Sequence, residues 1–84
     1  PDLGGSFEML HSVFAPGAEL SEAALRDTEE AGYVVSGRFD IEIGGIWHAL
    51  GEGDSFRFAR KPFRWRNLGS APAVVIWVVS PPVY

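Results

Sequence analysis

Glu30 is the residue of this chain whose type and place most favour chemistry. Strand alternation aims its side chain toward the interior, and a buried carboxylate without a partner is costly. The two histidines offer less. No other residue of metal-ligand type is spaced with His11 or His48, so we interpret both as structural. No nucleophile motif surrounds any serine, so Ser-His-Asp catalysis has no support.

Aromatic and basic residues alternate in the stretch FRWRN, 63–67. Successive side chains of a strand point to opposite faces, so Phe63 and Trp65 share one face while Arg64 and Arg66 share the other. Aromatic walls can hold the apolar part of a small ligand, or a cation over a ring. The alternative is that these rings only fill a small core.

Short runs rich in β-branched and aromatic residues, separated by Gly and Pro, predict the elements that would position these side chains. Gly44 and Gly45 indicate a hairpin turn. The segment 19–32 has helix-forming composition without an apolar stripe, so we interpret most of it as a loop or one helical turn. Short strands at this spacing indicate an all-β sandwich or barrel. We expect strands at 7–15, 33–37, 38–44, 46–50, 55–59, 63–67 and 73–80.

Length and composition describe one small folded domain. The chain has 84 residues and is 46% hydrophobic, so we assign 1–84 to a single domain, with 1–6 as a linker or N-terminal tail. The longest apolar run, 73–79, is far too short to cross a bilayer, and no signal peptide is recognisable. The absence of cysteine excludes disulfides, and we expect a cytoplasmic protein with no membrane partner.

Charge is distributed unevenly along the chain. The net charge of -4 argues against nucleic-acid binding by this segment itself. We interpret the basic residues of the C-terminal half as a solvated strand face that pairs with acidic neighbours across the sheet. The alternative is an anion-binding or partner-docking patch. These residues are Arg57, Arg60, Lys61, Arg64 and Arg66.

Two spaced motifs resemble those of the cupin superfamily. The first opens at Gly17, has Glu30 at its glutamate position and ends at Gly37, and the second opens at Gly53 and closes at Asn67. The resemblance covers nearly the whole chain and implies a small double-stranded β-helix, the cupin jelly-roll barrel. The pieces that match in order and spacing are EEAGYVVSGRFDIEIGG, GEGDSFRF and VIWVVSPPVY.

The same pieces are similar to one group within that superfamily, the C-terminal cupin domains of Xre-type helix-turn-helix transcriptional regulators. In that group the cupin domain senses an effector and usually ends the chain, as SPPVY does at 80–84. The resemblance implies that DNA is bound only through a helix-turn-helix domain absent from this chain. Such a chain would begin without methionine, as this one does at Pro1.

The histidines of the family's first motif are missing from the matching positions. With the opening spacing held strictly they fall at Ala23 and Leu25, and a shift of one residue gives Ala24 and Arg26. None of these residues is a metal ligand.

The histidine of the second motif is also missing. It falls at Phe63 when Asn67 is the anchor, or at Arg64 by strict count from Gly53. Only Glu30 remains of four ligands, and one carboxylate cannot hold a transition metal. We therefore predict no metal and no other cofactor.

The resemblance points the face of Phe63 and Trp65 into the barrel, where we expect Phe56 and Phe58 to line the same cavity. Glu30 then needs a cation, for which there are two candidates. Arg26 could fold in and replace metal and ligand structurally, or a bound amine could fill that role while Trp65 offers its ring face. The predicted ligand-binding residues are Glu30, Phe63, Trp65, Arg26, Phe56 and Phe58.

These expectations favour a metal-free sensor domain that binds a small amine-bearing or amphipathic effector in the barrel, without catalytic residues. The alternative is a small stand-alone cupin enzyme, an isomerase or lyase, with Glu30 as general base, although no second catalytic group is evident. We also expect a homodimer through a sheet face, because outward apolar residues such as Tyr33 and Val35 would otherwise be exposed.

Overall fold

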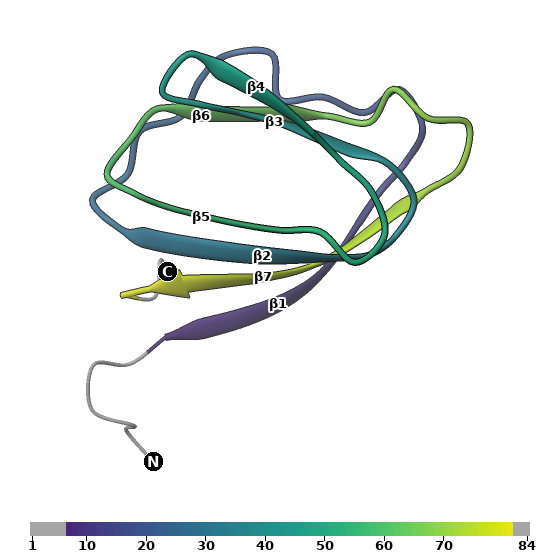
Figure 1. Ribbon diagram of the computed structural model, residues 1–84. Coiled ribbons are helices and arrows are strands. Elements are labelled where there is room, and N and C mark those ends of the chain that lie inside the picture. The colour runs from purple at the N-terminus through teal and green to yellow at the C-terminus, as the bar shows by residue number, and fades with distance from the viewer. Residues whose placement is uncertain (1–6, 82–84) are drawn as a thin grey trace.

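Two antiparallel sheets form the domain, and their inner faces are turned toward each other (Figure 1). The computed structural model describes residues 7–81; residues 1–6, assigned above to a linker or tail, and residues 82–84 of the predicted chain end lie outside the described range. The first sheet has the order β1-β7-β2-β5 and the second β4-β3-β6. The strands are β1 (Glu8–Phe14), β2 (Glu29–Ser36), β3 (Phe39–Ile43), β4 (Ile46–Leu50), β5 (Ser55–Ala59), β6 (Phe63–Arg66) and β7 (Ala73–Ser80).

The prediction of an all-β fold is confirmed, because residues 7–81 contain no helix. Within the same range, accordingly, no helix exists that could span a membrane. The segment 19–32, interpreted mostly as a loop or one helical turn, is a loop without a helical turn over 19–28, and its last four residues, 29–32, begin β2. Its first half runs along β6, where Leu20 N–H donates to Trp65 C=O at 2.9 Å and Ala24 N–H to Phe63 C=O at 2.8 Å. These bonds satisfy backbone groups of an edge strand, which outweighs the helix-forming composition.

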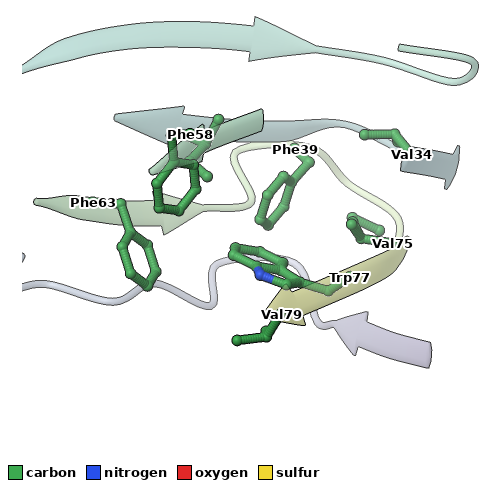
Figure 2. Packing of buried hydrophobic residues seen from close by; sticks show 9 residues of the cluster. Val34, Phe39, Phe58, Phe63, Val75, Trp77 and Val79 are labelled. Carbon is green, nitrogen blue, oxygen red and sulfur yellow. The ribbon is translucent and has the colours of Figure 1, made fainter. Parts of the chain in front are cut away.

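The inward side chains of both sheets form an aromatic core, much of which Figure 2 shows. Trp77 of β7 lies at its centre, with its ring centroid 6.0 Å from that of Phe39, 5.0 Å from Phe56 and 6.0 Å from Phe63. Strand β7 alternates buried and half-buried residues along its length, which is the pattern of a central strand with one face in the core. Each large side chain buried in this way contributes about 1.5–3 kcal/mol to folding.

Two glycines hold positions that a side chain could not occupy. Gly37 has a φ of 83°, and a Cβ there would lie 2.4 Å from the Pro72 carbonyl oxygen. Gly32 faces Phe56 across the β2–β5 pair, and a Cβ at Gly32 would lie 2.2 Å from that ring. The glycine that ends the first motif is thus explained by backbone geometry, and Gly32 allows Phe56 to lie flat against β2.

Candidate functional site

Glu30, the second residue of β2, is completely enclosed, and its carboxylate accepts four hydrogen bonds. Arg26 donates to both oxygens, from Nη2 to Oε1 at 2.7 Å and from Nε to Oε2 at 3.2 Å. Thr28 Oγ1 donates to Oε2 at 2.6 Å, and the indole Nε1 of Trp77 donates to Oε1 at 2.7 Å. Two donors on each oxygen fill the accepting capacity of the carboxylate.

Arg26 is the cation that Glu30 needs. Its side chain is 38% exposed while that of Glu30 is 0% exposed, so the pair joins the interior to the surface of the domain. The guanidinium carbon lies 5.0 Å from the centroid of the Phe63 ring, within cation–π range. Of the two candidate cations, Arg26 is the one that pairs with Glu30 in the structure. The pair has the bidentate geometry that makes arginine–carboxylate interactions strong.

A cavity of about 390 Å³ is lined by residues of β1, β6 and β7 and of the segment between β1 and β2. We call it the β1–β6 cavity. Its walls are mostly aliphatic and aromatic, and its polar groups are few, as in many small-molecule sites of comparable volume. It is lined by Glu8, Leu10, Ser12, Phe14, Leu20, Ala24, Arg26, Phe63, Trp65, Trp77 and Val79.

The residues predicted to bind a ligand fall into three groups in the structure. Arg26, Phe63 and Trp65 line the β1–β6 cavity together. Glu30 does not line it and is hydrogen-bonded to Arg26 at its edge. The two remaining phenylalanines, Phe56 and Phe58, pack in the interior and line a different hollow, because β5 and β1 are opposite edges of the first sheet.

The positions where the family carries its metal ligands converge here, but with other residue types. Ala24 and Arg26, from the shifted alignment, line the cavity with Phe63, whereas Leu25 is 67% exposed. Alanine, arginine and phenylalanine provide no ligand atom for a metal, and both oxygens of Glu30 are already bonded. Across residues 7–81 no group of three or more His, Cys, Asp or Glu could hold a metal ion. The residues present do not fit a metal.

Two partners of Glu30 were missed in the sequence analysis. The sequence places Trp77 only within the expected strand 73–80, although an indole N–H in a core requires an acceptor, and this requirement could have identified the contact. Thr28 lies two residues before Glu30 in a segment interpreted as a loop, and nothing in the sequence distinguishes it.

The expected pairing of arginines across the sheet is confirmed for the outer face of the second sheet. Arg64 contacts Glu42 at 2.9 Å and Arg66 contacts Asp40 at 3.5 Å. The hydrogen bond to Glu42 raises the pKa of Arg64 above its ordinary value. Both guanidinium groups also lie over Trp47, at 5.2 Å and 3.8 Å from its ring centroid. These arginines are paired with carboxylates, one of which, Asp40, is buried, and they do not form an unpaired basic strand.

Comparison with known proteins agrees with this geometry. A family model described as a cupin domain matches residues 10–79. This chain belongs to the cupin family. The cupin jelly-roll fold expected from the motifs is thereby confirmed. No curated protein sequence matches the chain.

Several solved structures superpose well on this chain. The cupin domain of an XRE family transcriptional regulator from Enterobacter cloacae is 30% identical, with a TM-score of 0.82, over 98% of this chain and 88% of that one. KdgF from a Halomonas species is 25% identical, with a TM-score of 0.83, over 94% and 73%. A putative sugar phosphate isomerase from Acidithiobacillus ferrooxidans, at 22% identity and a TM-score of 0.80 over 92% and 51%, shows the shared fold alone.

Proposed function

We propose that this cupin is a metal-free sensor domain that binds a small-molecule effector in the β1–β6 cavity and acts on a DNA-binding domain outside this chain. The observation that carries the proposal is the Arg26–Glu30 pair, which lies where the family's metal ligands would converge. Similarity to the cupin domain of a transcriptional regulator supports the sensing role. A regulator of this kind acts on DNA in the cytoplasm, which is the location we propose.

The lining of the cavity favours an amphipathic effector. Phe14, Phe63 and Trp65 contribute aromatic surface for an apolar body, and Trp65 lies 4.4 Å from Phe14 between ring centroids. Nη1 of Arg26 takes no part in the contacts with Glu30, and the Ser12 side chain lies on the same lining. A polar group of the effector would meet Arg26 and Ser12. Glu30 would position Arg26 and would not itself anchor an amine, since its oxygens are filled.

The same contacts weigh against the enzyme alternative. A general base needs an oxygen lone pair within reach of the substrate proton. Glu30 has no exposed side-chain surface, and each of its oxygens accepts two hydrogen bonds from Arg26, Thr28 and Trp77. This environment suits a structural carboxylate better than an isomerase or lyase base.

A screen followed by calorimetry tests the sensing role. We expect some member of a panel of amphipathic carboxylates, amines, amino acids and sugars to raise the melting temperature of the domain. Trp65→Ala should weaken that compound about tenfold, as for the loss of a central aromatic contact. Trp47→Ala is the matched control, because Trp47 lies on the outer face of the second sheet and does not line the cavity. Equal losses for both variants would contradict the proposed site.

We also propose that the outer face of the first sheet pairs with the same face of a second copy. Met9 and Tyr33 on this face are 63% and 49% exposed, and the residues between them on β7 are Ile76 and Val78. With strands about 4.8 Å apart and about 3.3 Å per residue, the face measures roughly 19 by 26 Å, so two copies would bury on the order of 1,000 Å². That area reaches the lower range of specific interfaces, and no small effector could cover it.

Light scattering at micromolar concentration should therefore give the mass of a dimer. Tyr33→Lys should give a monomer, because it places a charge at the centre of the apolar face. Glu22→Lys, a change in the exposed segment before β2, should leave the dimer intact. A monomeric mass for the unaltered protein at the highest soluble concentration would overturn this pairing.

A further inference from the structure

The barrel has a second hollow, between the edge strands β4 and β5, which nothing in the proposed function uses. Its volume is about 600 Å³, and we call it the β4–β5 hollow. β5 is the edge strand of the first sheet opposite β1, and β4 is the edge strand of the second sheet opposite β6 (Figure 1). The hollow lined by β4 and β5 therefore lies on the other side of the barrel from the β1–β6 cavity. It is lined by Ile43, Ile46, His48, Leu50, Ser55, Phe56, Arg57, Phe58, Ala59 and Lys61.

The two cations that line this hollow are the two that the domain leaves unpaired. Five of the seven basic residues form ion pairs with carboxylates. Arg57 and Lys61 form none with any residue in the range 7–81, and both line the β4–β5 hollow. No Asp or Glu lines it, although the chain has eleven acidic residues and a net charge of -4. The local charge is therefore opposite in sign to that of the chain.

Apart from Arg57, Lys61, His48 and Ser55, the walls of the hollow are apolar. Ile46 is 64% exposed at its rim, Leu50 and Phe56 lie deeper, and the Phe56 and Phe58 rings are stacked with centroids 6.3 Å apart. A purely inorganic anion would leave this surface in contact with water, whereas an anion with an acyl or aryl body would cover it.

We propose that the β4–β5 hollow binds a small amphipathic carboxylate, with its apolar body against Ile46, Leu50 and Phe56 and its charge between Arg57 and Lys61. Arg57 alternates with Phe56 and Phe58 along β5 and so lies on the outer side of that edge strand, where it borders the hollow, and Lys61 borders it from the turn between β5 and β6. A carboxylate held at this rim would have a cation on either side. Phe56 and Phe58, which the sequence predicted to line a ligand site, then have that role here and not beside Trp65. This site is independent of the proposed effector cavity.

Titration with octanoate tests the site, with octylamine and octanol as probes of equal chain length and different charge. Octanoate should shift the backbone amide NMR signals of β4 and β5. Octylamine, which is cationic, and octanol, which is neutral, should each bind at least several-fold more weakly. Arg57→Gln and Lys61→Gln should each weaken octanoate about two- to fivefold, the range expected for an exposed ion pair. The double variant should lose about tenfold or more, and added salt should weaken binding further.

Arg60→Gln is the matched control, because Arg60 adjoins Lys61, pairs with Asp27 at 2.8 Å and does not line the hollow. It should leave octanoate binding unchanged. Three results would overturn the proposal: equal affinity for octylamine and octanoate, an equal loss in Arg60→Gln and in the double variant, or octanoate shifts confined to Trp65 and its neighbours in the β1–β6 cavity.

Discussion

The β1–β6 cavity and the β4–β5 hollow lie at opposite edges of one small barrel and differ in whether their cations are neutralised by a carboxylate. In the first, the cation that lines the wall is Arg26, and Glu30 directly behind it neutralises it. In the second, no Asp or Glu lines the wall, and Arg57 and Lys61 form no ion pair with any residue of the described range 7–81. Both hollows are lined by cations, but only the first has a carboxylate outside its lining that neutralises the cation. The residues that line a hollow therefore do not by themselves determine how much charge a ligand would meet there.

Removing Arg26 is the largest perturbation of this comparison. Arg26→Met leaves the Glu30 carboxylate buried with only Thr28 and Trp77 as donors, and should lower the free energy of unfolding by about 2–3 kcal/mol. This estimate lies below the full cost of breaking a buried pair because Arg26 is partly exposed. Chemical denaturation measures it.

A second variant separates the pair from the individual residues. Arg26→Met combined with Glu30→Gln removes both charges, and should recover part of the stability lost by Arg26→Met alone. If the double variant were less stable by the sum of the two single losses, the pair would not act as a unit, and the contrast between the two hollows would lose its basis.

Removing one neutral donor from Glu30 should have a smaller effect. Trp77→Phe keeps a ring in the core and deletes the N–H that bonds Oε1 at 2.7 Å, at a cost of about 1–2 kcal/mol. Trp47→Phe, the corresponding change on the outer face of the second sheet, should cost less than about 0.5 kcal/mol. Thermal unfolding of both variants measures the difference, and equal losses would show that the indole N–H is unimportant.

Added metal should have no effect. Both oxygens of Glu30 are bonded and its neighbours provide no ligand atom, so Zn²⁺, Ni²⁺ or Mn²⁺ at a small molar excess should leave the melting temperature unchanged. Elemental analysis of the dialysed protein should likewise find far less than one equivalent. A stoichiometric metal would show that Arg26 can leave Glu30, and it would contradict the conclusion that the residues of the β1–β6 cavity do not fit a metal.

Much of the fold could be predicted from the sequence because its signals are local. Alternation in 38–44, the Gly-Gly hairpin and the β-branched run at 73–80 each fix a strand without knowledge of its partners. The loop within 19–32 could be predicted, but its extended path could not, because that path depends on hydrogen bonds to β6, which is distant in the sequence.

The candidate site could also be predicted in part, where the signals in the sequence are local. Strand alternation predicted an inward Glu30 and a shared face for Phe63 and Trp65, and the resemblance to cupins predicted that this face points inward; the structure agrees with both. Alternation cannot show which edge of the barrel an inward residue reaches. Phe56 and Phe58, expected beside Phe63 and Trp65, line the β4–β5 hollow, although Phe58 also packs against Phe63 with ring centroids 5.0 Å apart. Whether Arg26 folds in depends on the whole path of the chain between β1 and β2, which no local pattern specifies.

The indole N–H signals of the three tryptophans offer the most direct test of effector binding at the β1–β6 cavity. In a ¹H–¹⁵N titration with the best compound from the screen, the Trp65 indole and the amides of Ser12 and Ala24 should shift together in a saturable way. The Trp47 indole should stay in place, because it lies on the outer face of the second sheet. A compound that stabilises the domain while leaving the signals of Trp65, Ser12 and Ala24 unmoved would contradict the proposed sensor site.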